Sequence, residues 1–215
     1  MSDIILREMA EGLAQVDDLS WGMYAFSRDI LRDKVSEAEK KRMIEHAICC
    51  GYEMADKVMS SLGTWDPWEL AEKLKLNVEY GNRGQIADSV LFALFTPPNQ
   101  IQIMKEPIEL AAESGLLKGL LTMEQMERLI LGHEIFHYLE EEEKEIYTRK
   151  EKVVLWKLFG YKSKSTVRVL SEIAGMYFSK KINGFSYSPF ALDILLYYNY
   201  NSNEALKMYR EVLSF

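Results

Sequence analysis

Along most of the chain, apolar residues recur at the three- or four-residue spacing that places them on one face of a helix. This pattern covers residues 4–60 and then separates into shorter segments with polar stretches between them. Ser36 followed by Glu39, and Thr122 followed by Gln125, are side-chain pairs typical of helix starts. Beyond residue 60, helices are expected over 66–75, 106–114, 122–142, 153–159, 165–182, 188–198 and 203–213.

A different pattern, in which apolar and polar residues alternate, marks three short segments at 76–80, 89–95 and 100–104. Alternation with a period of two is typical of strands that bury one face. Turn-forming residues separate these segments at 81–84 and 96–99. The sequence therefore predicts an α+β protein that is mainly helical and contains a small antiparallel or mixed sheet of about three strands.

No internal repeat, low-complexity linker or clear boundary divides the chain. Residues 1–62 are expected to form an N-terminal helical region and residues 63–215 the main domain. Gly63 ends the helical pattern between them, as glycine commonly does after a helix. The polar residues 149–152 are expected to form a loop. Because no flexible segment separates the two regions, we expect one compact unit.

Charge and cysteine content narrow the classes of function. The 215 residues include 33 acidic and 26 basic side chains, which gives a formal net charge of -7. This balance disfavours a nucleic-acid-binding surface, although a local basic patch is compatible with it. We therefore expect no nucleic acid as a partner. No run of about 18 apolar residues and no secretory leader is visible, so we expect no membrane as a partner either. The adjacent Cys49 and Cys50 do not suit a structural disulfide, and we expect a cytoplasmic protein.

Candidate chemistry comes from an H-E-x-x-H motif inside an apolar helical segment. His133 and His137 are four residues apart, so they lie one turn apart on the same helix face. Two imidazoles in this arrangement can share one Zn²⁺ ion, and Glu134 stands where a general base for a zinc-activated water is needed. The alternative is a helix with two ordinary core histidines. Without a metal or other partners, burying two imidazoles and a carboxylate would cost much free energy. We therefore expect a zinc metallopeptidase, a hydrolase in which Glu134 is the catalytic residue.

A catalytic zinc ion needs a third protein ligand. No histidine follows the motif, and glutamates stand at the two positions where the longer metzincin pattern has Gly and His, so a carboxylate is expected. The candidates are Glu172, the glutamates at 140–143, Glu145, Glu151 and Asp193. Glu172 is favoured because it is a lone carboxylate in an apolar helical segment, whereas residues 140–143 are expected to be the solvated end of the motif helix. Small residues at Ala174 and Gly175 would let this segment pack closely against the motif helix.

These two segments carry a resemblance. The H-E-x-x-H motif, followed by Glu172-Ile173-Ala174-Gly175-Met176-Tyr177-Phe178-Ser179, resembles the ImmA/IrrE family of zinc metallopeptidases. The segment beginning Asp66-Pro67-Trp68-Glu69, which leads to a short sheet, is similar to the family's helix before its sheet, and the resemblance spans roughly residues 50–185. It implies a zincin-like fold of the gluzincin type, with zinc held by His133, His137 and Glu172 and with Glu134 as the base. It also implies a helix-turn-helix repressor as a protein substrate.

The sequence leaves parts of the reaction open. The donor that polarises the substrate carbonyl has four candidates: Tyr138, Tyr177, Tyr187 and Arg168. The sheet edge that takes up an extended peptide is either strand 89–95 or strand 100–104. Three other functions are compatible with the motif. They are a zinc-binding regulatory protein with little peptidase activity, a zinc hydrolase for a non-peptide substrate, and a helical structural protein with a coincidental motif.

Overall fold

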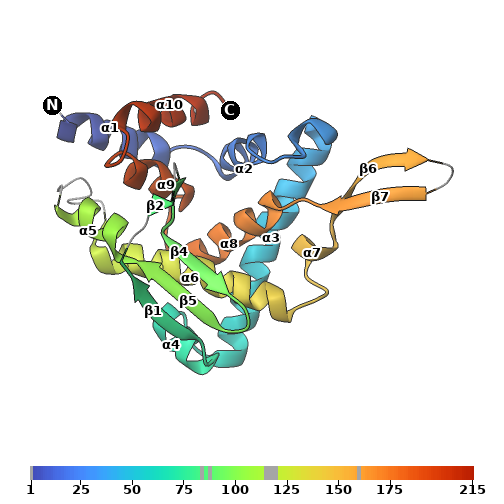
Figure 1. Ribbon diagram of the computed structural model, residues 1–215, viewed down its shortest axis with the longest axis horizontal. Coiled ribbons are helices and arrows are strands. Elements are labelled where there is room, and N and C mark those ends of the chain that lie inside the picture. Colours follow the sequence, from blue (N-terminus) through green and yellow to red (C-terminus); the bar gives the residue numbers. More distant parts are fainter. Residues whose placement is uncertain (1, 83–84, 87–88, 114–120, 159–160) are drawn as a thin grey trace.

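The computed structural model describes residues 2–82, 85–86, 89–113, 121–158 and 161–215 (Figure 1). The helices are α1 (Ser2–Ala14), α2 (Asp18–Ser27), the 3-10 helix η1 (Arg32–Lys34), α3 (Glu37–Leu62), α4 (Pro67–Lys73), α5 (Lys105–Glu113), α6 (Met123–Glu142), α7 (Tyr147–Lys150), α8 (Val169–Ile182), α9 (Phe190–Tyr197) and α10 (Ser202–Val212). The strands are β1 (Asn77–Gly81), β2 (Gln85–Ile86), β3 (Ser89–Val90), β4 (Ala93–Thr96), β5 (Gln100–Met104), β6 (Lys152–Leu158) and β7 (Tyr161–Thr166).

A mixed three-stranded sheet covers one side of α6. Its order is β1-β5-β4, with β1 parallel and β4 antiparallel to the central β5. Ile101 and Ile103 of β5 are fully buried because they share the face that lies against the helices. The expected α+β class and the expected small sheet of about three strands are therefore confirmed. Two further pairs, β2 with β3 and β6 with β7, lie outside this sheet.

Helix α8 packs against both α3 and α6, and glycines allow the close approach (Figure 1). A Cβ on Gly51 of α3 would overlap the carbonyl oxygen of Ala174 in α8. A Cβ on Gly132 of α6 would lie 2.9 Å from Ser179 Oγ. That hydroxyl donates a hydrogen bond of 2.6 Å to the carbonyl oxygen of Leu129, which ties α8 to α6. The backbones of α3 and α8 are therefore in near contact, and side chains of α8 lie directly against the α6 backbone at Gly132.

Residues 153–159 do not form the expected helix. They belong largely to β6, which pairs with β7 in an antiparallel hairpin, with Leu158 opposite Tyr161. A short apolar run that contains valine and tryptophan suits a strand. The run is too short for the spacing of its apolar residues to distinguish a helix from a strand. The expected helix end at Gly160 lies outside the described residues. Because β7 runs through Thr166, the next helix begins at Val169 rather than at 165.

Two smaller expectations also change. The expected loop at 149–152 is wrong, because α7 includes residues up to Lys150 and β6 begins at Lys152. The expected strand 89–95 is divided: β3 pairs with β2, and β4 joins the main sheet. Part of the expected turn at 81–84 lies outside the described residues.

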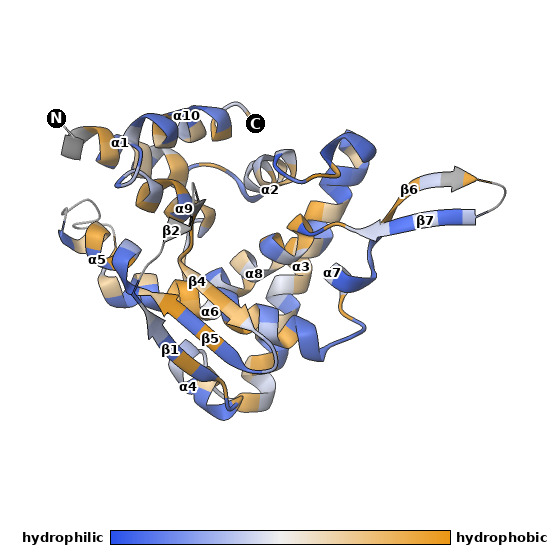
Figure 2. Cartoon of the chain, in the orientation of Figure 1, coloured by the Kyte–Doolittle hydropathy of each residue, from blue (hydrophilic) through white to orange (hydrophobic). Residues whose placement is uncertain are grey.

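One hydrophobic cluster runs through the molecule and contains buried residues from Leu6 in α1 to Val212 in α10. Figure 2 shows hydrophobic residues concentrated on β4, β5 and α9, whereas β7 is mostly hydrophilic. Within the described residues, no helix has both the length and the apolar composition needed to cross a membrane.

We expect Gly51→Ala to lower the free energy of unfolding by about 1–2 kcal/mol, because the added methyl group forces α3 away from the α8 backbone. Ser60→Ala, at an exposed position of the same helix, is the matched control and should change stability by less than about 0.5 kcal/mol. Urea unfolding followed by circular dichroism measures both. Equal stability of the two variants would contradict the close approach of α3 and α8.

Candidate metal centre

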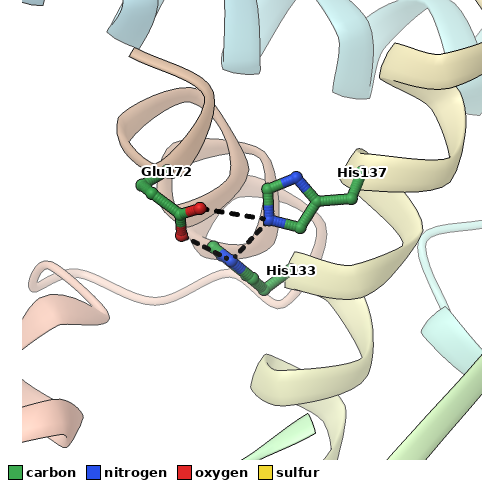
Figure 3. A group of neighbouring side chains, drawn as sticks. All are labelled: His133, His137 and Glu172. Atoms are coloured by element: carbon green, nitrogen blue, oxygen red, sulfur yellow. Dashed lines mark hydrogen bonds and ion pairs between the residues drawn. The ribbon is translucent and has the colours of Figure 1, made fainter. Parts of the chain in front are cut away.

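The two histidines of α6 direct their rings at one point. His133 Nε2 and His137 Nε2 lie 2.9 Å apart (Figure 3). At most one of these nitrogens can carry a proton that points at the other, so at least one lone pair faces the space between them. The helix has a paired cap, Thr122 with Gln125, which fixes its start. The one-turn spacing of the motif therefore becomes a pair of convergent ligand atoms.

Glu172, in the first turn of α8, completes the cluster. Its Oε2 lies 3.3 Å from His133 Nε2, and its Oε1 lies 3.8 Å from His137 Nε2 (Figure 3). Tetrahedral zinc binds such ligands at about 2.0–2.2 Å, which separates the ligand atoms by about 3.4 Å. The three measured separations bracket that value. Two imidazoles and one carboxylate are also a donor set that catalytic zinc uses, so the residues present fit the ion.

The remaining carboxylate candidates lie elsewhere. In the described part of the chain, the only group of three or more potential ligands close enough to share an ion is His133, His137 and Glu172. Glu145 pairs with Lys150, and Glu151 pairs with Arg42 on α3. Each of these two carboxylates therefore has a basic partner outside the ligand group.

The charges of this cluster depend on one another. Burial alone would lower the pKa of His133, but the hydrogen bond and the negative charge of Glu172 outweigh burial and raise it. Burial would raise the pKa of Glu172, and the two histidines lower it instead. The side chain of His133 is only 13% exposed, whereas that of Glu172 is 53% exposed. A cation that binds here takes the place of the proton shared by this pair.

A second layer of polar groups supports His137, and it includes Glu140. Ser171 Oγ lies 3.3 Å from His137 Nδ1 and donates a hydrogen bond of 2.5 Å to Glu140 Oε2. Thr148 Oγ1 donates to the other oxygen of Glu140. Burial opposes the charge of Glu140, but these hydrogen bonds lower its pKa below the usual value. The expectation that residues 140–143 form a solvated helix end is therefore wrong for Glu140, which is 15% exposed.

The backbone of α8 lies directly against the first histidine. A Cβ on Gly175 would come within 3.0 Å of both Nδ1 and Cε1 of His133. This contact bears out the expectation that a small residue at 175 lets the two helices pack closely. His133 Nδ1 is buried and, among the described residues, has no hydrogen-bond partner. The Nδ1 side of the ring is therefore held by packing against α8, whereas the Nε2 side makes the polar contacts with Glu172 and His137.

The start of α8 is held by an aspartate from a distant part of the chain. Arg168 precedes the helix, and its side chain makes no capping hydrogen bond. Instead, Asp29 Oδ2 accepts a hydrogen bond of 3.1 Å from the Val169 backbone N–H, and its Oδ1 accepts one of 2.7 Å from the Leu31 N–H. Asp29 is buried. The first turn, which carries Glu172, is thereby fixed to the segment after α2.

Glu134 faces a cavity beside the ligand cluster. The side chains of His133, Glu134 and Glu172 line this cavity, which has a volume of about 510 Å³. Glu134 is buried, yet its position on the wall leaves its carboxylate beside a space that a substrate can enter. Across the cavity, Asp193 of α9 also lines the wall, and burial raises its pKa to about 7. Asp193 is thus a wall residue rather than a member of the ligand cluster.

The structure separates the four candidate carbonyl donors from the cavity. Among the residues that line the cavity, none of Tyr138, Tyr177, Tyr187 and Arg168 occurs. Tyr177 is fully buried and donates its hydroxyl to the carbonyl oxygen of Asp18 at 3.2 Å. The wall instead carries Tyr197 and Arg28. Sequence reasoning missed both, because only the packing of α2 and α9 brings them to the site.

The chain matches no family model, no curated protein and no solved structure.

We expect the purified protein to bind one zinc ion, and we expect His133→Ala and Glu172→Ala to abolish stoichiometric binding. Glu140→Gln should weaken zinc affinity about 10- to 100-fold, because it removes the charge that orients His137 through Ser171. Competition with a zinc chelator measures the affinity. Glu142→Gln, at an exposed position of the same glutamate run, is the control and should bind zinc as the wild type does. A Glu140→Gln variant with unchanged affinity would contradict the supporting role of this residue.

Proposed function

We propose that this chain is a zinc-dependent metallopeptidase with a zincin-like fold of the gluzincin type, related to the ImmA/IrrE family that its motifs resemble. One observation carries the proposal. His133, His137 and Glu172 converge at separations that suit a single tetrahedral zinc ion, and the buried Glu134 lines the adjoining cavity. A metal-binding cluster without a catalytic role would not need a carboxylate and an open cavity on the same side.

Zinc bound by this cluster supplies a Lewis acid that lowers the pKa of water from 15.7 towards about 7. Glu134 follows His133 on α6, so its carboxylate stands beside the cluster and accepts the proton from the attacking water. It then gives that proton to the leaving amine. The apolar residues around it, among them Leu129 and Ile130, exclude bulk water from this part of the wall.

The sheet supports an extended peptide as the substrate. Of the two strands considered from the sequence, β5 is paired on both sides, whereas β4 is an edge of the described sheet. The Met104 N–H donates a hydrogen bond of 2.9 Å to the carbonyl oxygen of Phe92. Hydrogen-bonded and non-hydrogen-bonded residue pairs alternate along antiparallel strands. The N–H and C=O groups of Ala93 and Phe95 therefore point away from β5. Phe92 and Ala93 also line the cavity. A peptide that adds to this edge as a strand therefore runs past Glu134.

The partner that follows is a peptide or protein substrate. The resemblance to the ImmA/IrrE family favours a helix-turn-helix repressor, whose cleavage would release the genes it controls. A cytoplasmic location agrees with this substrate class and with the free Cys49 and Cys50.

We expect Glu134→Gln to retain one zinc ion per chain and to lower the rate of peptide hydrolysis about 10²- to 10⁴-fold, because glutamine cannot accept the proton. The measurement combines metal analysis with fluorogenic peptides of mixed sequence. Glu124→Gln, at an exposed position in the first turn of the same helix, is the control and should keep full activity.

Two outcomes would contradict the proposed function. Full activity of Glu134→Gln would remove the assigned base. A zinc-loaded wild-type protein that cleaves neither the peptides nor an unfolded protein would instead favour a zinc-binding regulatory protein of the same architecture.

A further inference from the structure

The β6–β7 hairpin, called the arm below, extends away from the helical body (Figure 1). Val153 at the start of β6 and Val167 just after β7 are buried and hold its base to the body. β7 also contacts α7 near this base. Leu155 is partly buried against the core as well, and beyond it Trp156, Leu158, Tyr161 and Lys162 are exposed. These exposed side chains are therefore available to a partner.

One face of the arm is apolar. Residues directly opposite each other in a hairpin share a face, and Trp156 lies opposite Ser163 while Leu158 lies opposite Tyr161. Trp156, Leu158 and Tyr161 are 51%, 57% and 68% exposed. The rings of Trp156 and Tyr161 lie in tilted contact, with their centroids 5.8 Å apart, so the two side chains form one apolar surface. Large apolar side chains gathered at an exposed site mark a contact surface.

The other face is basic. Lys162 and Lys164 alternate with Tyr161 and Ser163 along β7, so they project from the opposite face. Both lysines are exposed, as is Lys152 at the base of β6. In the described residues no carboxylate lies within ion-pair distance of any of these three. The stretch 152–166 contains four of the chain's 26 basic residues and none of its 33 acidic ones.

We propose that the arm binds the surface of an anionic lipid bilayer. The face formed by Trp156, Leu158 and Tyr161 enters the interfacial region, where aromatic side chains are favoured. The lysines extend around the hairpin edge and place their ammonium groups among the lipid phosphates. This contact is peripheral and needs no membrane-spanning helix.

The separation of the two faces favours lipid over nucleic acid. A protein that binds single-stranded nucleic acid stacks bases on aromatic rings and contacts the adjacent phosphates from the same groove. On the arm, the aromatic and basic groups lie on opposite faces, and exposed Leu158 offers a base nothing to stack on. An apolar surface with a basic surface behind it is the arrangement of interfacial elements.

The projection of the arm resolves an apparent conflict with the acidic composition. The absence of an apolar run of about 18 residues led to the expectation that no membrane is a partner, and the net charge of -7 also opposes attraction to anionic lipid. That sum averages over the whole chain, whereas attraction to charged lipid falls off within a Debye length of about 8–10 Å. Because the arm extends from the body, the lysines along β7 can approach the bilayer ahead of the acidic helices (Figure 1). The proposal is independent of whether the cavity cleaves peptides.

The full-length, zinc-loaded protein should sediment with vesicles of phosphatidylcholine containing about 30% phosphatidylserine and should not sediment with pure phosphatidylcholine vesicles. Lys162→Ala combined with Lys164→Ala should lower partitioning about 30-fold, since each lysine near the surface contributes roughly a factor of five. Lys34→Ala combined with Lys41→Ala makes the same change in charge on the body. This control pair, also exposed, should lower partitioning less than about twofold.

A second set of variants tests insertion of the apolar face. Trp156→Ala combined with Leu158→Ala should lower partitioning at least about tenfold and leave zinc content unchanged, because both side chains are exposed. Trp156→Phe keeps an aromatic ring and should still bind. Brominated lipids should quench part of the tryptophan emission of the wild type, and this quenching should be absent in Trp156→Phe, because the quenched part comes from Trp156.

The proposal is overturned if the wild type does not sediment with the anionic vesicles, or if the control lysine pair lowers partitioning as much as the arm pair. It is also overturned if the arm variants instead lose binding to a 30-nucleotide single strand, or lose a concentration-dependent dimer seen by analytical ultracentrifugation. Quenching of all tryptophans alike in the wild type and in Trp156→Phe would likewise exclude insertion of the arm.

Discussion

The close approach of α8 to α6 is the constraint on which the candidate site depends. The two histidines lie on one helix and would face each other in any folded state of that helix. Glu172 reaches them through the packing of α8 on α6, in which Gly175 lets the α8 backbone lie against the His133 ring and Gly132 leaves room for the Ser179 side chain. The same approach brings Ser171 to Glu140, so the ligand cluster and its supporting hydrogen bonds arise from one helix–helix contact. A larger residue at either glycine would act on both layers at once.

Local spacing predicts part of this site well. The positions of His133, Glu134 and His137 follow from helix geometry alone, and Glu172 stands out because it is charged among apolar neighbours. Glu140 was missed because its neighbours in the run share its composition. A signal was nonetheless present, since Glu140 is three residues after His137 and so faces the same side of the helix. Glu141, four residues after His137, lies on that side as well, so only the hydrogen bonds from Ser171 and Thr148 separate Glu140 from its exposed neighbours.

Other features depend on contacts between distant segments, and no local pattern contains them. The cavity wall joins Arg28 after α2, Glu134 of α6 and Tyr197 of α9, and sequence periodicity gives each helix without giving its neighbours. Residues 153–159 of the arm were predicted as a helix because a seven-residue, mainly apolar run fits either a helix or a strand, and only the pairing of β6 with β7 decides between them. The average charge of the chain hid the basic character of the same segment.

The hydrogen bond from the Val169 N–H to Asp29 joins residues 140 positions apart in the chain. It makes the N-terminal helices a structural part of the ligand cluster, because the turn that bears Glu172 has no cap of its own. Genetic exchange of the first few dozen residues for an unrelated module would leave that turn without its acceptor. The folding of the segment around Asp29 is therefore coupled to the geometry of the candidate cluster, although Asp29 contributes no atom to that cluster.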